Sequence, residues 1–574
     1  MAALLVPTML AAGLPLAAAE PERAGRPTMM APSEMVVTPS SLASESALNV
    51  LRQGGNALEA AITAAATMAV VYPHYNALGG DNFWLIYNAK TGETVGLNGS
   101  GRAGEKASID FYEDKGMKTI PARGWLAAIT VPGVVAGWGE AFRYATGPMG
   151  GTKTWKDMLS DALGYATGGF PVSIGQAKWT RIATDPTDGV IKNLQRFPSF
   201  AATYLKPDGK AYEVGEMFRQ PDLAATLRRI AENGDREFYE GETARRIVAD
   251  IAANGGLLTA ADFRAQKADW IKPISVAYRG FTAVNLPPNT QGMASLSILN
   301  ILNNFDVRSL GDRSPEYVHL IVEATKQAFA DRDRYLTDPD FNTIPLEFLL
   351  SAKHGAELAA RIDRKIVAQN VRPLDPKGDT VWLGVVDRDG NAVSLIQSHY
   401  FDWGAGVVAK DTGVLLQNRG SFFSLDRNAV NRLEPRKRSF HTINPAMLMS
   451  GGKPYLVYGT QGGEGQPQTQ AAIVTRIVDF GLPVQTAIEA PRWLQGRAWG
   501  TTGNGLMLEG RWPASVAAAL AELGHSVAVI DDYTDIMGTA GAILIDPRHA
   551  GEIRRRRPTR RRRGTRPLRP ATVS

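Results

Sequence analysis

The spacing of apolar residues predicts helices along the first two-thirds of the chain. Residues 44–51 form one short amphipathic pattern, and residues 57–71 form a second, which Asn56 can cap and Pro73 can end. The stretches 83–88 and 94–98 flank the turn AKTGE, and this strand–turn–strand pattern predicts a hairpin. Apolar residues then recur every three or four positions through much of residues 155–368, so this part is predicted to be mostly helical.

The pattern changes after the polar, breaker-rich loop 369–379. Residues 381–387 and 392–398 flank the turn Arg388-Asp389-Gly390-Asn391 and predict a second hairpin. Further strands are predicted at 413–418, 439–449, 453–459, 526–532 and 540–546, with helices near 470–479, 484–490 and 513–523. We expect an α+β layered fold in which the first hairpin and the last third share one mixed sheet.

The amino-acid composition excludes some kinds of catalytic and metal-binding site. The chain has 574 residues, of which 44% are hydrophobic and 21% charged, so it can bury a large core without disulfides or metals. The absence of cysteine excludes a thiol nucleophile and a Cys-ligated metal. None of the seven histidines lies in an H-E-x-x-H or H-x-H pattern, so we expect no metal and no cofactor.

The net charge of +6 comes from the C-terminal segment. Residues 551–574 hold ten Arg and one Glu, whereas the rest carries 53 Lys and Arg against 56 Asp and Glu. Such a tail could contact nucleic acid or anionic lipid, or it could be a disordered extension. No aromatic residue lies between the arginines, so base stacking is unsupported, and we expect no nucleic-acid partner.

The N-terminal residues 1–24 are predicted to be a cleaved signal peptide or a disordered leader. Residues 2–19 are mostly apolar and end in Ala17-Ala18-Ala19 before the polar Glu20, although Pro7 and Pro15 interrupt them and no Lys or Arg precedes them. A periplasmic or secreted location follows from the first interpretation, and a cytoplasmic one from the second. No later segment reaches about 18 uninterrupted apolar residues, so we expect no membrane span.

Long motifs in a fixed order carry a family resemblance. They are the segment 35–93, VPGVVAGW (131–138), DRDGNAVSL (387–395), GAGVV (404–408), GVLLQN (413–418), INPAM (443–447) and GTQGGEGQPQ (459–468). From about Met35 to Pro547 the chain resembles the gamma-glutamyltranspeptidase family of N-terminal-nucleophile hydrolases. The resemblance implies a four-layer αββα sandwich made as one chain and cut before a threonine.

The resemblance implies a cut between Asp379 and Thr380. It would separate a helix-rich large subunit (30–379) from a strand-rich small subunit (380–550), and the two would stay together. A threonine opening a strand is by itself an ordinary strand residue. After the cut, however, Thr380 gains a free α-amine with an ordinary pKa of about 7.7–8.0, which can take the hydroxyl's proton.

Three other residues complete the implied catalytic group. Ser398 takes the place of a family threonine that supports the nucleophile, although an edge hydroxyl bonded to water would look the same. The backbone N–H groups of Gly462 and Gly463 would form an oxyanion hole. A phosphate loop is the rival interpretation, but GTQGGEGQPQ lacks the required Lys. The G-x-G-x-x-G match at residues 99–104 has no clear helix after it and predicts a turn.

The expected substrate-binding residues depart from the family pattern. Asn418 is kept, but Arg419 and Phe422 stand where the family recognises the ammonium of a γ-glutamyl group. The other expected contacts are Tyr400 in place of an Asn, His441 and Thr442 in place of paired serines, and Arg102 as a substitute for a carboxylate-binding arginine that aligns with Ser100. Val381-Trp382-Leu383 also replace the Thr, His and aromatic residue that usually follow the nucleophile.

These departures leave the substrate open. The family implies an autoprocessing amidohydrolase or acyltransferase that cleaves γ-glutamyl-type amides such as glutathione through an acyl-threonine. A guanidinium would repel an ammonium but bind a carboxylate, which favours an acylase for glutaryl- or oxamate-like groups without an α-amine. Arg419 could instead be a surface arginine with Phe422 in the core. An inactive binding homologue is the remaining alternative.

Overall fold

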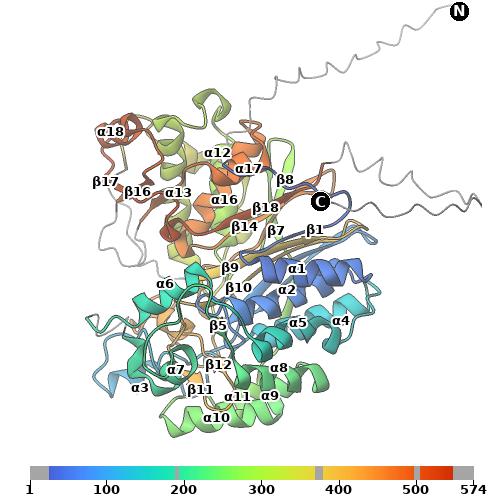
Figure 1. Cartoon of the computed structure of the whole chain (residues 1–574). Coiled ribbons are helices and arrows are strands. Elements are labelled where there is room, and N and C mark those ends of the chain that lie inside the picture. The colour runs from blue at the N-terminus through green and yellow to red at the C-terminus, as the bar shows by residue number, and fades with distance from the viewer. Residues whose placement is uncertain (1–24, 188–192, 369–378, 497–504, 547–574) are drawn as a thin grey trace, which may run out of the picture.

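Two antiparallel sheets stack face to face between two layers of helices (Figure 1). The computed structural model describes residues 25–187, 193–368, 379–496 and 505–546. The leader 1–24, most of the loop before Thr380 and the basic tail 551–574 therefore lie outside the described residues. The layering confirms the predicted αββα architecture.

The first sheet joins the two predicted hairpins. Its strand order is β1-β9-β10-β2-β3-β6. The strands are β1 (Met35–Val37), β9 (Asp379–Val386), β10 (Ala392–Tyr400), β2 (Asp81–Asn88), β3 (Glu93–Gly99) and β6 (Asp269–Ile271). β10 pairs with β9 on one side and with β2 on the other, so segments about 300 residues apart in sequence lie side by side.

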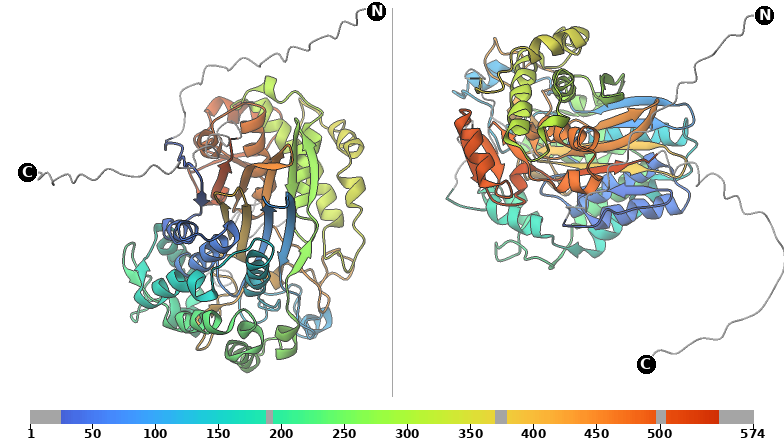
Figure 2. Two further views of the ribbon diagram at one scale, coloured as in Figure 1. Left: turned by 90° about the vertical axis from the view of Figure 1, so that its right-hand side faces the viewer. Right: turned by 90° about the horizontal axis from the view of Figure 1, so that it is seen from above.

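The second sheet corrects the expectation that the last third joins the first hairpin in a single sheet. Its order is β18-β14-β13-β8-β7, seen edge-on against the first sheet in Figure 2. The strands are β18 (Ala540–Leu544), β14 (Lys453–Thr460), β13 (Ala446–Ser450), β8 (Phe281–Asn285) and β7 (Ile274–Tyr278). Periodicity along one chain does not reveal which sheet a strand joins, because a strand buried on both faces, as β2 and β10 are, has a continuous apolar pattern that carries no sign of its sheet.

The helices divide between the two outer faces. On the first sheet lie α1 (Ser41–Arg52), α2 (Ala57–Val71), α4 (Val134–Thr146), α5 (Trp155–Gly168) and α8 (Pro221–Asn233). On the second lie α12 (Gly292–Leu302), α13 (Pro315–Tyr335) and α16 (Gln466–Val478). Every residue of α2 is buried, because its many alanines let it pack against β9, β10 and the neighbouring helices.

Smaller elements surround these four layers. The helices are α3 (Ile109–Glu113), α6 (Ile174–Ala183), α7 (Pro198–Tyr204), α9 (Glu237–Glu240), α10 (Glu242–Ala253), α11 (Ala260–Ala265), α14 (Leu346–Leu349), α15 (Ala352–Ala359), α17 (Val484–Glu489) and α18 (Ala514–Glu522). The strands are β4 (Phe170–Pro171), β5 (Met217–Phe218), β11 (Val408–Ala409), β12 (Val414–Leu415), β15 (Trp493–Gln495), β16 (Leu506–Glu509) and β17 (Val527–Ile530). The strand predicted at 413–418 is thus only two residues long.

The Trp382 side chain of β9 packs against the second sheet, two residues from the predicted nucleophile. Its ring fills a slot that glycines leave open, since a Cβ on Gly459 would lie 2.2 Å from the ring and one on Gly541 would lie 2.5 Å from it. The indole Nε1 donates to Ser394 Oγ at 2.9 Å, so the polar atom is satisfied inside the core. This packing fixes β9 two residues beyond Thr380.

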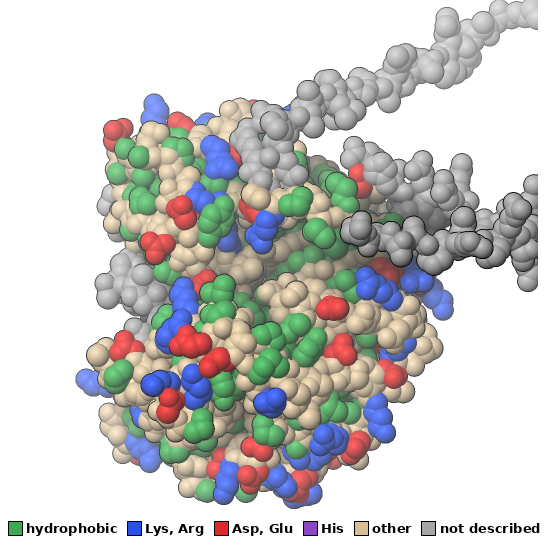
Figure 3. Space-filling model, viewed as in Figure 1, with side chains coloured by type: hydrophobic (Ala, Val, Ile, Leu, Met, Phe, Trp, Pro, Cys, Tyr) green, Lys and Arg blue, Asp and Glu red, His purple; other side chains and the backbone are tan. Residues whose placement is uncertain are grey.

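Charged side chains of both signs are mixed on the face of the molecule drawn in Figure 3. In Figure 3, Lys and Arg side chains alternate with Asp and Glu over the face in view. Among the described residues, no helix combines the length and the apolar character needed to cross a bilayer.

Candidate active site

Thr380 lies at a β-bulge between β9 and β10, two neighbouring inner strands of the first sheet. Val381 pairs with Gln397 and Asp379 with Tyr400, so Ser398 and His399 together oppose Thr380. Such bulges re-aim side chains and are common beside active sites. Thr380 is buried, and its Oγ1 has no hydrogen-bond partner among the described residues. The hydroxyl is thus held out of water and forms no hydrogen bond within the described part of the chain.

Ser398 stabilises the backbone at the bulge. Its Oγ accepts a hydrogen bond from the Tyr400 N–H at 2.8 Å. Tyr400 has a φ of +84°, a left-handed conformation that a residue with a side chain rarely adopts. Ser398 therefore holds the strained turn that lies directly opposite Thr380.

Asp81 is the central polar residue that the sequence analysis missed. It begins β2 and pairs in register with Ser398. Its Oδ1 accepts from the N–H groups of Gly101 at 2.9 Å and Gly133 at 3.1 Å, and from Gln417 Nε2 at 3.1 Å. The sequence signal for this residue is the Asp of GGDN (79–82), which lies within the family-like segment 35–93.

His441 is the fourth partner of Asp81, and its side chain is fully buried. Its Nε2 lies 2.8 Å from Asp81 Oδ2, and its Nδ1 lies 2.9 Å from the Ser439 carbonyl. Burial lowers the pKa of His441, and the charge of Arg419 lowers it further, so the imidazole is neutral near pH 7. Next to it, the Thr442 hydroxyl is buried without a partner among the described residues.

Arg419 is the most unusual charge in the site. It is fully buried, and none of its three guanidinium nitrogens has a hydrogen-bond partner among the described residues. Desolvation lowers its pKa to about 10, while Tyr400 and Asp81 act in the opposite direction. The alternative that Arg419 is a surface arginine is therefore wrong. A buried guanidinium without a partner is costly unless an anionic ligand binds it.

Tyr400 contacts Arg419, and further aromatic rings pack against Tyr400 in a chain. The rings of Tyr400 and Phe422 are 5.2 Å apart, and those of Phe422 and Phe440 are 4.7 Å apart, both edge to face. The Asn418 side chain accepts from the Phe401 N–H at 3.1 Å and donates to the Ala122 carbonyl at 2.8 Å. It therefore holds the chain on either side of the site, and a substrate contact through its second amide hydrogen stays a prediction.

The glycine pair follows β14 and precedes α16. Gly462 has a φ of +114° and Gly463 a φ of +51°, both in the left-handed region that favours glycine. Among the described residues, neither of their N–H groups forms a hydrogen bond. Free N–H groups at the start of a helix are suited to bind a developing oxyanion.

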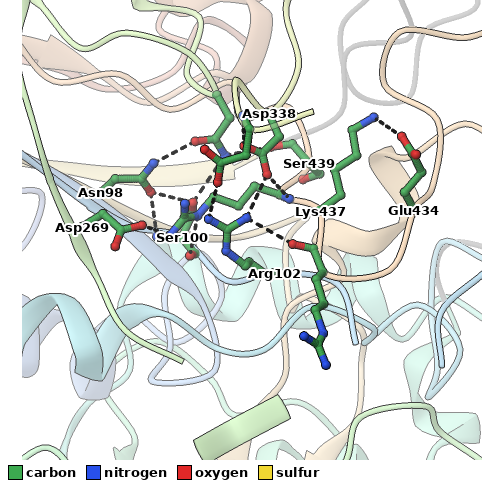
Figure 4. Close-up of polar contacts among 12 residues, drawn as sticks. Asn98, Ser100, Arg102, Asp269, Asp338, Glu434, Lys437 and Ser439 are labelled. Atoms are coloured by element: carbon green, nitrogen blue, oxygen red, sulfur yellow. Dashed lines mark hydrogen bonds and ion pairs between the residues drawn. The ribbon is translucent and has the colours of Figure 1, made fainter. Parts of the chain in front are cut away.

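Arg102 is not joined to the group around Arg419. Its guanidinium donates to Asp338 Oδ2 at 3.1 Å, to Asp340 Oδ2 at 2.7 Å and to the Arg436 carbonyl at 3.1 Å (Figure 4). A substrate carboxylate would have to compete with both aspartates. The prediction that Arg102 binds substrate remains untested, and the geometry favours Arg419.

One cluster of metal-binding side chain types occurs away from this site. His319, Glu323 and His525 place three possible ligand atoms within 4.8 Å of one another. His319 Nδ1 lies 2.8 Å from His525 Nε2. Lys326 Nζ is already bonded to Glu323 at 2.7 Å. The Lys326 ammonium thus places a positive charge on Glu323, while His525 Nδ1 is buried with no hydrogen-bond partner among the described residues.

Two face-to-face sheets between two layers of helices are the architecture of the N-terminal-nucleophile hydrolases. Residues 43–564 match the family model described as Gamma-glutamyltranspeptidase, and the chain belongs to that family. The match extends beyond Pro547, where we expected the resemblance to end. The protein is therefore a hydrolase of this family.

Relatives and solved structures agree with this assignment. The chain is 47% identical over 515 residues to the glutathione hydrolase-like YwrD proenzyme of Bacillus subtilis, covering 89% of this chain and 94% of that one. It is 44% identical to the oxamate amidohydrolase proenzyme of Klebsiella pneumoniae, with the same coverage. The cephalosporin acylase structure from Bacillus halodurans superposes with a TM-score of 0.83 at 36% identity, covering 93% and 95% of the two chains.

Proposed function

We propose that the chain cuts itself between Asp379 and Thr380 and that Thr380 then serves as the nucleophile of an amidohydrolase. The buried hydroxyl at the bulge supports this role. It would attack the Asp379 carbonyl, the Asp379–Thr380 C–N bond would break as its nitrogen takes the hydroxyl proton, and water would then cleave the resulting ester to leave a carboxylate on Asp379 and regenerate the hydroxyl. The new α-amine of Thr380 becomes a base whose ordinary pKa is about 7.7–8.0.

The same groups would serve turnover. The Thr380 amine takes the hydroxyl proton as Oγ1 attacks the substrate amide, and the N–H groups of Gly462 and Gly463 stabilise the oxyanion, each contributing about 3–4 kcal/mol. The proton then passes to the leaving amine, which leaves an acyl ester on Thr380. Water, or an acceptor amine in a transfer reaction, releases the acyl group and regenerates the hydroxyl.

The acyl group carries a carboxylate, and the unpaired Arg419 is the observation that supports this. A carboxylate can accept two parallel hydrogen bonds from the guanidinium. An α-ammonium beside it would need an acceptor, and Asp81, the acid that acts electrostatically on Arg419, has both oxygens engaged by four donors. We therefore favour glutaryl- or oxamate-like acyl groups. Gamma-glutamyl amides are the second candidate, because several relatives are named glutathione hydrolases.

Two measurements test the proposal. The intact mass of the purified protein should show two fragments meeting at Thr380, whereas Thr380→Ala should remain a single chain without amidase activity. At equal concentration, glutaryl-anilide should be cleaved faster than γ-glutamyl-anilide. A preference for the γ-glutamyl compound would refute the role given to Arg419. An uncut, inactive wild-type chain would favour a binding homologue.

We also propose export of the protein, on the basis of the apolar leader. Expression in a bacterial host, fractionation and N-terminal sequencing would test it. Full-length protein confined to the cytoplasm would oppose it.

A further inference from the structure

A single buried amide joins two parts of the proposed site. Gln291 is the N-cap of α12, and its Nε2 donates to the Thr442 carbonyl at 2.6 Å and to the Gly463 carbonyl at 2.9 Å. Both hydrogens of the amide are thereby used. The side chain is fully buried, so water cannot replace either bond. Gln291 therefore fixes the distance between the segment around Thr442 and the glycine loop.

Arg332 fixes the orientation of that amide. Its Nη1 donates to Gln291 Oε1 at 2.8 Å, and because a guanidinium only donates, the NH₂ end must face the two carbonyls. The same nitrogen pairs with Glu464, the residue after Gly463. The guanidinium lies 3.7 Å from the centre of the Phe329 ring and is fully buried. The glycine loop is thus fastened through both the Gly463 carbonyl and the Glu464 carboxylate.

The directions of the glycine N–H groups depend on these attachments. Gly462 and Gly463 have no side chains that could hold the loop by packing. Glycine can also adopt many backbone conformations besides the left-handed one observed here. The Gly465 N–H donates to the Gly462 carbonyl at 2.8 Å, which orients the planar peptide that contains the Gly463 N–H. Holding the Gly463 carbonyl fixes the next peptide plane, so the loop keeps one shape.

The backbone of the same turn adds two further bonds. The Gln291 N–H donates to the His441 carbonyl at 3.0 Å, and the His441 N–H donates to the Asn289 carbonyl at 2.8 Å. The segments 289–291 and 441–442 therefore move together. Residues 289–291 belong to the predicted large subunit and the others to the small one, so this attachment must survive the cut.

We propose that Gln291, oriented by Arg332, is a positioning residue for acyl transfer: it aims the oxyanion donors of Gly462 and Gly463 relative to the acyl-binding residues. This role rests on the proposed function of the glycine pair. Gln291 touches no reacting atom. Its loss should weaken binding of the transition state while leaving ground-state binding of the carboxylate, which depends on Arg419, nearly unchanged.

Gln291→Met tests the role, with Asn300→Leu as the matched control. Asn300 lies on the same helix, and its Nδ2 also donates to two backbone carbonyls, Leu350 at 3.3 Å and Ser351 at 2.8 Å. Gln291→Met should lower kcat for glutaryl-anilide about 10- to 100-fold with KM within threefold. Asn300→Leu should lower Tm comparably but leave kcat within twofold. Should Gln291→Met fail to fold, Arg332→Lys, which keeps the charge beside Glu464 but not the geometry, should show a smaller kcat loss.

An inhibitor pair separates this proposal from the proposed function. A carboxypropyl boronic acid would form a tetrahedral adduct on Thr380 with an oxygen at the glycine N–H groups, whereas glutarate would bind only as the carboxylate. Gln291→Met should raise the Ki of the boronic acid at least tenfold and that of glutarate less than threefold. Equal losses for both inhibitors, or a kcat loss no greater than in Asn300→Leu, would overturn the positioning role. If Thr380→Ala binds the boronic acid as tightly as wild type, the proposed nucleophile itself is wrong.

Discussion

The Arg419 guanidinium carbon lies 4.3 Å from the centre of the Tyr400 ring. A desolvated cation–π contact of this kind contributes about 2 kcal/mol. Burial of a charge without a hydrogen-bond partner costs several kcal/mol, so the contact offsets only part of the cost. The free protein therefore retains an unfavourable charge at the place where a carboxylate can neutralise it.

Arg419→Met should stabilise the protein and impair substrate binding. Replacing the unpaired guanidinium with an apolar chain of similar length should raise the free energy of unfolding by about 1–4 kcal/mol. The KM for glutaryl-anilide should rise at least about 30-fold, because a charge-assisted fork is lost. Denaturant unfolding in a Thr380→Ala background and steady-state kinetics of the cut enzyme measure the two effects.

Arg123→Met is the control for that variant. Arg123 is also buried, but its Nη2 lies 3.2 Å from Asp402 Oδ1. Its removal takes away the guanidinium that pairs with the buried Asp402 carboxylate and should destabilise the protein by about 3–5 kcal/mol. If Arg419→Met destabilises as much as Arg123→Met, then Arg419 has a structural partner and is not held for a ligand.

Asp81→Ala should destabilise the protein more than Asp81→Asn does. Asn keeps an oxygen for the two glycine N–H groups and Gln417, but its NH₂ faces His441 Nε2, so the imidazole must shift its proton to Nδ1, which can donate to Ser439. We expect a loss of about 1–3 kcal/mol for Asn and a larger loss for Ala, which leaves four donors without an acceptor. Denaturant unfolding gives the energies, and ¹⁵N chemical shifts of His441 give the tautomer. An unchanged tautomer in Asp81→Asn would contradict this account.

Local sequence patterns predict the elements of this protein better than its contacts. The helix predicted at 44–51 spans 41–52 in the structure, and the helix at 57–71 and both hairpins agree with their predictions, because amphipathic spacing and turn residues are local. Thr380 and Arg419 could be singled out from their motifs. Asp81 also lies in a motif, the GGDN of segment 35–93, but its central role could not be predicted, because three of its four hydrogen-bond partners are 52 to 360 residues away in sequence. Gln291 was missed for the same reason, since its side chain bonds span 41 to 172 positions.

Acid should destabilise the fold through His399, which opposes Thr380. Burial lowers the pKa of His399 to about 4, whereas the unfolded value is about 6.5. As the pH falls between these values, the unfolded chain takes up a proton that the folded chain does not, so stability falls by about 3 kcal/mol from pH 7 to pH 4. We expect the free energy of unfolding of Thr380→Ala to fall more between pH 7 and pH 4 than that of Thr380→Ala/His399→Gln. The difference between the two losses should be about 3 kcal/mol. Between pH 7 and 9, where the group is neutral in both states, the two proteins should show the same pH dependence.

The contact between Trp382 and Gly459 should couple core packing to self-cleavage. A Cβ at Gly459 would overlap the indole, so Gly459→Ala should cost about 3 kcal/mol and displace β9, whose first residues are Asp379 and Thr380. Trp382→Leu should make room for the new methyl. The double variant should therefore be more stable than the sum of the single losses by about 1–3 kcal/mol, and it should regain part of the cleavage rate. Unfolding in the Thr380→Ala background and intact mass over time in the cleavable chain measure these two quantities. Additive energies with an unaltered cleavage rate would show that the indole and Gly459 do not control the position of Thr380.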